Sequence, residues 1–135
     1  MVARTNRCVR CLGGVILSLT VIVALSGCGA KPTNELVELT KSRDSSDRVR
    51  AVRALGERGA ESDVVVPALT EALKDEDAFV RRDAARGLGQ IGPTASTAVP
   101  ALRTASRDKN QHVRQAAADA IRKIAPDLPP EPRKK

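Results

Sequence analysis

Apolar residues divide the chain into two regions with different patterns. Between positions 12 and 25 they form a nearly continuous run without a charged residue. From position 31 onward they recur every three or four residues among charged side chains, which is the spacing of helices with one buried face. The clearest stripe consists of Val80, Ala84, Leu88 and Ile91. The pattern predicts helices for the second region and a separate kind of segment for the first.

The helical region repeats itself with a period of 33 residues. The sets in register are Leu36, Leu69 and Leu102; Ala51, Ala84 and Ala117; Leu55, Leu88 and Ile121; Lys41, Lys74 and Arg107; and Arg48, Arg81 and Arg114. Such a period is typical of solenoids, in which each unit hides its apolar stripe by stacking on the next. The sequence therefore predicts an all-α solenoid of three helical hairpins.

The middle copy shows how one unit is built. Pro67 suits the first turn of a short first helix, because its missing amide hydrogen would have no partner there. The acidic segment 75–77 then breaks this helix, and Asp77 can cap the second helix by accepting hydrogen bonds from its free amides. That second helix is expected to end at Gly89 or Gly92.

The pattern in all three copies places helices at 34–41 and 47–58, 65–74 and 78–91, and 98–107 and 111–124. The repeats then cover about 34–59, 65–92 and 98–125. The β-branched run at 64–66 is the one strand-like feature, and its place between helices favours a linker or a helix entry. The segment 126–135 carries four prolines and a basic end, which predicts an extended tail. The tail either has no task or touches anionic lipid or cell-wall polymer.

The start of the chain has the three parts of an export signal. Arg4, Arg7 and Arg10 precede the apolar run, and no acidic residue occurs among them. The run of about 14 residues is shorter than the roughly 20 that a membrane-spanning helix needs. A cleaved signal is therefore favoured over a permanent span.

The signal ends in Leu25, Ser26, Gly27 and Cys28, which resemble the lipobox of bacterial lipoproteins at every position. The resemblance implies that the Cys28 sulfur carries a diacylglyceryl group and that the preceding residues are removed. Two or more acyl chains anchor a protein stably, because each buried methylene contributes about 0.8 kcal/mol. The alternative is an ordinary signal whose small residues happen to precede a cysteine.

The domain organisation follows from this cleavage. Residues 1–27 are the expected signal peptide, 28–33 a lipidated tether, 34–125 the repeat domain and 126–135 the tail. The protein is expected to be exported and lipid-anchored to the cell membrane or the outer membrane.

Residues 77–92 carry the motif Asp-x-x-Val-Arg-x-x-Ala-Ala-x-x-Leu-Gly-x-Ile-Gly. Together with 66–69 they resemble HEAT repeats, and more narrowly the short HEAT-like units named after phycobilisome lyase subunits. The resemblance covers about 34–125 and implies a right-handed α-solenoid. The Thr-Pro-Leu-His of ankyrin repeats and the Trp and Tyr of tetratricopeptide repeats are missing.

The resemblance also implies roles for two sets of residues. A turn Asp and a following Arg form a structural ladder between HEAT repeats, which maps by register to Asp44, Asp77 and Asn110 and to Arg48, Arg81 and Arg114. Second helices usually line the concave face of a HEAT stack. The candidate protein-binding face there comprises Arg53, Arg82, Arg86, Gln90, Gln115, Asp119 and Lys123, and the alternative is that these are only solvated helix residues.

Composition weighs against catalysis and against nucleic-acid binding. Much of the net charge of +7 lies in the leader and the tail, so a nucleic-acid partner is not expected. Cys8 and Cys11 have a C-x-x-C spacing but lie in the leader without a second pair. His112 is the only histidine, and a surface or packing role suits it better than a catalytic one. We expect no catalytic residue, metal or cofactor.

The sequence thus predicts a membrane-anchored, non-catalytic HEAT-repeat adaptor or scaffold whose protein partner is unknown. One alternative is a structural envelope component that associates weakly with itself, and a remote one is an accessory subunit similar to bilin lyases. Phe79 is the only aromatic residue, so the core must consist of small aliphatic side chains. Without Trp or Tyr, binding is expected to be weak or to depend on several copies held together in the membrane.

Overall fold

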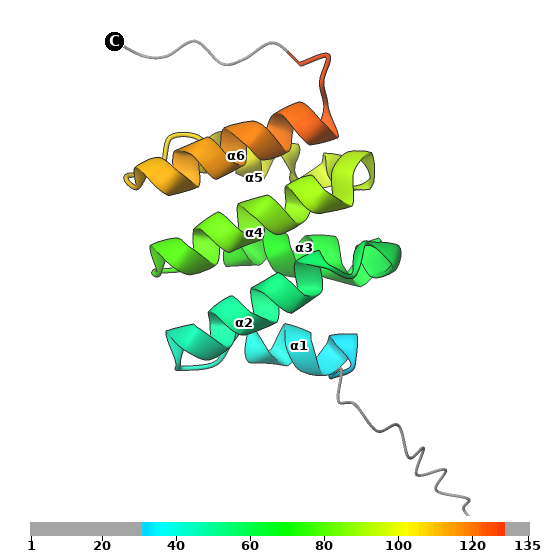
Figure 1. Cartoon of the computed structure of the whole chain (residues 1–135), viewed down its shortest axis with the longest axis vertical. Helices are drawn as coiled ribbons and strands as arrows, with labels where there is room; N and C mark the ends of the chain where they lie inside the picture. The colour runs from blue at the N-terminus through cyan, green and yellow to red at the C-terminus, as the bar shows by residue number, and fades with distance from the viewer. Residues whose placement is uncertain (1–30, 129–135) are drawn as a thin grey trace, which may run out of the picture.

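The structure is a computed structural model that describes residues 31–128, and these form three stacked helical hairpins (Figure 1). The helices are α1 (Thr33–Leu39), α2 (Ser45–Gly56), η1 (Gly59–Glu61), α3 (Ser62–Ala72), α4 (Ala78–Ile91), η2 (Gly92–Ala98), α5 (Val99–Ala105) and α6 (Gln111–Ile124), where η marks a 3-10 helix. No strand occurs within residues 31–128. The predicted all-α solenoid is confirmed.

The second helices of the hairpins form one layer and the first helices form another. In Figure 1, α2, α4 and α6 lie in front, and α1, α3 and α5 lie behind them. α4 packs between α2 and α6, so each second helix contacts the second helix of the next repeat. The chain winds from hairpin to hairpin in the right-handed sense that the HEAT resemblance implies.

The second helices begin at equivalent capping residues. The side chains of Asp44, Asp77 and Asn110 accept hydrogen bonds from backbone amides two residues further on, at 2.8, 2.7 and 2.8 Å. Each bond satisfies one of the amides that a helix start leaves without an intrahelical partner. The predicted Asp77 cap is confirmed. α4 ends at Ile91, and the next residue, Gly92, has a φ of 74° that favours glycine.

Two first helices differ from the sequence prediction. α3 starts at Ser62, so Pro67 lies inside the helix and not in its first turn. The helix tolerates Pro67 because Asp63, whose carbonyl loses its partner, is exposed to water. The run 64–66 is therefore helical. In the third copy the 3-10 helix η2, which bends at Ala95, precedes α5, and α5 covers 99–105 of the expected 98–107.

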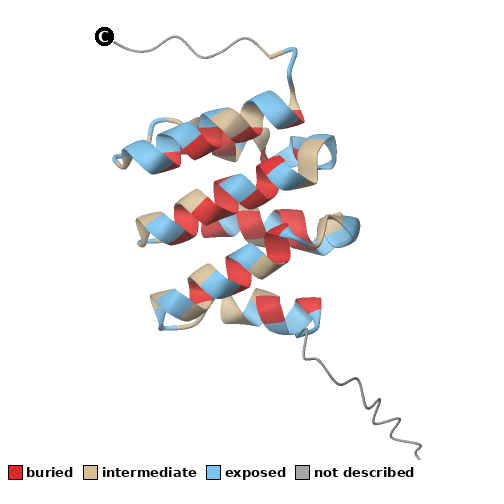
Figure 2. Cartoon of the chain, viewed as in Figure 1, coloured by how far each residue is buried: buried red, intermediate tan, exposed pale blue. Residues whose placement is uncertain are grey.

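Buried residues lie where the two layers and the successive repeats face one another (Figure 2). Leu55, Leu69, Leu88 and Leu102 are the largest fully buried side chains, and most other core residues are Val or Ala. Small side chains bury little area each, so close approach between helices has to compensate.

Glycine allows this close approach at two equivalent crossings. A Cβ atom on Gly56 would lie 2.8 Å from the Cα of Gly87, and one on Gly89 would lie 3.0 Å from the Cα of Ala120. The shift of 33 residues relates the two pairs, so α2 crosses α4 as α4 crosses α6. Any side chain at Gly56 would force the helices apart.

Candidate protein-binding groove

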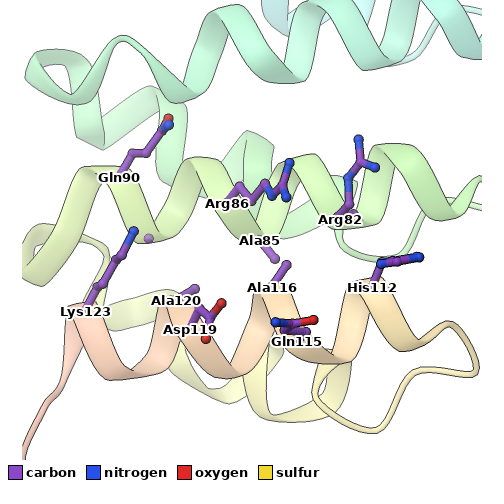
Figure 3. Close-up of a pocket in the computed structure, with 11 residues that line it drawn as sticks. Arg82, Ala85, Arg86, Gln90, His112, Gln115, Ala116, Asp119, Ala120 and Lys123 are labelled. Atoms are coloured by element: carbon purple, nitrogen blue, oxygen red, sulfur yellow. The ribbon is translucent and has the colours of Figure 1, made fainter.

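A groove of about 420 Å³ runs between α4 and α6. Its floor consists of the small residues Ala85, Gly89, Ala116 and Ala120. Figure 3 shows Ala85 and Ala116 facing each other between the two helices. Because these floor residues are so short, the longer side chains beside them form the walls of an open channel, called here the α4/α6 groove.

The walls of the α4/α6 groove are polar and come from both helices (Figure 3). α4 supplies Arg82, Arg86 and Gln90, and α6 supplies His112, Gln115, Asp119 and Lys123. The structure thus brings together every residue of the candidate face except Arg53. His112, for which we expected a surface or packing role, is an exposed residue of the wall.

Arg53 joins the face through a buried carboxylate. Asp83 is 4% exposed and accepts hydrogen bonds from Nε of Arg53 at 2.6 Å and from Nε of Arg82 at 2.8 Å. Burial alone raises the pKa of Asp83, but the bonds from Arg82 and Arg53 outweigh it and hold the pKa below its ordinary value. We call these three residues the Asp83 cluster. It fixes two arginines that the sequence suggested only as face residues.

Sequence reasoning missed both the burial of Asp83 and the exposure of Phe79. The side chain of Phe79 is 61% exposed, and the guanidinium of Arg82 lies over the ring at 5.1 Å from its centre. A hollow of about 340 Å³ lies beside it, between the starts of α2 and α4. This Phe79 hollow is lined by Ser45, Ser46, Val49, Arg50, Arg53, Asp77 and Phe79.

The ladder between repeats uses different aspartates from those expected. Arg48 donates from Nε and Nη2 to Asp75 at 2.8 and 3.0 Å, and Arg81 donates in the same way to Asp108 at 2.7 and 3.0 Å. The assignment of Asp77 and its equivalents Asp44 and Asn110 to the ladder was wrong, because their side chains cap the second helices. Asp75 lies in the turn before α4 and Asp108 in the turn before α6, and each is next to an arginine of the previous repeat.

Comparison with known proteins identifies this architecture. A profile of HEAT repeats matches residues 33–122. The chain belongs to the HEAT-repeat family. A search of the curated proteins gives no match.

Among solved structures, this HEAT-repeat chain is similar to a chain in the complex of CpcE and CpcF of phycocyanin lyase from Nostoc sp. PCC7120. The two share 30% sequence identity with a TM-score of 0.65. The match covers 79% of the HEAT-repeat chain and 42% of the solved chain. Our protein therefore spans less than half the length of that relative.

The arginine of the third HEAT repeat, Arg114, differs from its equivalents in the first two repeats. Nη1 of Arg114 donates to the carbonyls of Asp108 and Lys109 at 2.8 and 3.0 Å, as Arg48 and Arg81 do in their own turns. Within residues 31–128 no carboxylate pairs with Arg114. Arg114 is exposed, since no other repeat within residues 31–128 covers it.

The remaining sequence predictions concern other kinds of site. No group of three or more His, Cys, Asp or Glu residues in the described part of the chain is arranged to hold a metal ion. None of the helices described between 31 and 128 is long and apolar enough to cross a membrane. Cys28 and the rest of its lipobox, Leu25, Ser26 and Gly27, lie outside the described residues.

Proposed function

We propose that this HEAT-repeat protein is a non-catalytic adaptor or scaffold that binds another protein and is held at a bacterial membrane by lipid on Cys28. The observation that carries the proposal is the α4/α6 groove, with its floor of Ala and Gly and its walls of long polar side chains. A channel of this kind accepts a segment of another protein, while the wall residues supply hydrogen bonds and charges that select it.

Two further observations support binding over catalysis. The arginines of the Asp83 cluster are fixed before any partner arrives, which lowers the entropy lost on association. The chemistry of the walls also offers little for catalysis. It consists of amides, guanidinium groups, one ammonium, one carboxylate and one imidazole, with neither a thiol nor a hydroxyl nucleophile.

Photocrosslinking in cells tests the proposal directly. A photoreactive amino acid replaces Gln90 or Gln115 in the groove, and a control chain carries it at Thr104, which is exposed on α5 of the other layer. We expect the two groove positions to capture the same protein, identified by mass spectrometry, and Thr104 not to capture it. Equal capture at all three positions, or none at the groove, refutes the proposal.

The alternative function is that of a structural component that associates with itself. Arg122 stands where Gly56 and Gly89 stand in the earlier repeats, so its side chain opposes the close helix crossing that another copy would need on α6. The molar mass of the full chain, measured in detergent over a range of concentrations, separates the two functions. A mass that rises with concentration, without a captured partner, supports the structural alternative.

The phycocyanin lyase complex motivates a more remote candidate, an accessory subunit of the bilin-lyase type. Its basis is the similarity in fold and sequence, at 30% identity over 42% of the solved chain. Likeness of fold alone does not transfer an activity. Mixing the purified chain with a free bilin and recording the visible spectrum tests this candidate, and an unchanged spectrum excludes bilin binding.

A further inference from the structure

We infer that the partner segment is acidic and carries an apolar side chain that packs against Phe79. This inference rests on the protein-binding function proposed above, and it names the chemistry of the partner. Three features of the layer formed by α2, α4 and α6 support it: an exposed aromatic ring, a fixed group of arginines, and nearby acids that already have partners.

Phe79 is an unusual surface residue in this molecule. Only Phe79 and Val64, at 61% and 44% exposure, are large hydrophobic residues that the described chain leaves exposed. Val49 lines the Phe79 hollow beside the ring, so an entering apolar side chain meets two apolar surfaces. Phenylalanine and arginine are both enriched at protein interfaces relative to the rest of the surface.

Arginines surround this apolar position and exceed the local acids. Arg53 and Arg82 share the single buried carboxylate of Asp83, and Arg53 keeps 60% of its side chain exposed. Arg86, one helical turn beyond Arg82, is exposed and forms no ion pair among residues 31–128. Because Asp83 fixes two of these three guanidinium groups, a carboxylate of the partner meets donors already in position.

The acids on the same face have their own partners. Asp77 accepts the amide of Phe79 as the cap of α4, and Asp119 pairs with Arg122 on α6. Neither neutralises the Asp83 cluster or Arg86. A partner segment with several carboxylates therefore complements this face, whereas a basic segment is repelled.

A selection from a random peptide library, displayed on phage and run against the immobilised full chain in detergent, tests the inference. We expect the selected peptides to be enriched in Asp and Glu around an apolar residue. Phe79→Ala and Arg86→Glu should each weaken their binding by about tenfold or more, as for central interface residues. The matched controls are Val64→Ala, which truncates the other exposed hydrophobic residue, and Lys109→Glu, which makes the same charge change in an exposed turn.

Three outcomes overturn the inference. The first is that the selected peptides show no excess of acidic residues. The second is that they bind Phe79→Ala with the same affinity as the parent chain. The third is that the control variants weaken binding as much as Phe79→Ala and Arg86→Glu do. Circular dichroism of each variant checks that it is folded, and Arg86→Gln replaces Arg86→Glu if the latter is not. Capture of a protein at Gln90 and Gln115 in cells is independent of these results, so the proposed function and the partner chemistry can fail separately.

Discussion

Arg48, Arg81 and Arg114 occupy the same position in successive repeats, yet their surroundings differ. The side chains of Arg48 and Arg81 are 8% and 7% exposed and bind a carboxylate of the next repeat through two nitrogens. Arg114 keeps the bonds to its own turn, but within residues 31–128 no repeat stacks on it. The position of a residue in the stack thus decides whether the same side chain joins two repeats or only supports a turn.

We therefore expect Arg81→Ala to lower the free energy of unfolding by about 3 kcal/mol, because it leaves Asp108 without its partner in a largely buried place. Arg114→Ala, in an exposed position, should cost less than about 1 kcal/mol. Urea unfolding followed by circular dichroism measures both. Equal losses would contradict the assignment of the ladder to Arg81 and Asp108.

A second prediction at the residue scale concerns Cys28, whose lipidation we propose from its sequence context. Cys28→Ala removes the sulfur proposed to receive the diacylglyceryl group, so labelling with a radioactive fatty acid should disappear and the uncleaved precursor should accumulate. Ser26→Ala, which keeps the small residue that the lipobox requires, serves as the control and should be labelled normally. Unchanged labelling of Cys28→Ala would refute the anchor.

At the scale of the elements, the second helices depend on glycine for their mutual packing. α2 and α4 meet at Gly56 and Gly87, and α4 and α6 meet at Gly89 and Ala120. Glycine inside a helix costs up to about 1 kcal/mol relative to alanine. Helix propensity alone therefore favours alanine at these positions, and the crossing reverses this preference.

Gly56→Ala should destabilise the protein by about 1 to 3 kcal/mol, because its Cβ would lie 2.8 Å from the backbone of Gly87 and the helices would have to shift. Gly59→Ala is the matched control, since its Cβ would find only ordinary contacts at 3.8 Å with Ile91. Thermal unfolding of the two variants compares them. A Gly56→Ala protein as stable as the parent would show that this crossing adapts without cost.

At the scale of the whole molecule, stability depends on contacts between repeats, because one apolar core runs through all three hairpins. The core consists mainly of Leu, Val and Ala. Bidentate ion pairs join the turns of the second and third repeats to the repeat before them. The pair of Arg81 and Asp108 makes the stack sensitive to acid. A hydrogen bond from Arg81 is the largest cause that holds the pKa of Asp108 below its ordinary value of 3.8, against the smaller opposing effect of burial.

Because the folded pKa of Asp108 lies below the unfolded value of 3.8, its contribution to stability is complete well above pH 3.8. It starts to decrease near that value and is lost as the pH falls through the lower, folded pKa. The free energy of unfolding should therefore decrease between about pH 5 and pH 2. Asp108→Asn should be less stable at neutral pH and should show a smaller decrease in acid, as measured by urea unfolding at several pH values. A decrease as large as that of the parent chain would assign the acid sensitivity to other groups.

Much of the fold was determined by the sequence alone, because its signals act over a few residues. The apolar spacing and the period of 33 predicted the hairpins, and the bounds of α4 and α6 agree with the predicted 78–91 and 111–124. Caps such as Asp77 need only a backbone amide two residues away. Most residues of the α4/α6 groove were also foreseen, since register places them on the same side of equivalent helices.

Ion pairs and burial that involve residues about one repeat apart became visible only in the tertiary structure. Sequence distinguishes neither Asp75 from Asp77 as the partner of Arg48 nor a solvated Asp83 from one buried between Arg53 and Arg82. The close approach at Gly56 and the exposure of Phe79 likewise depend on how neighbouring helices cross. Local hydrogen bonds and periodicity are written into short segments, whereas burial and ion pairing between repeats exist only once the hairpins have stacked.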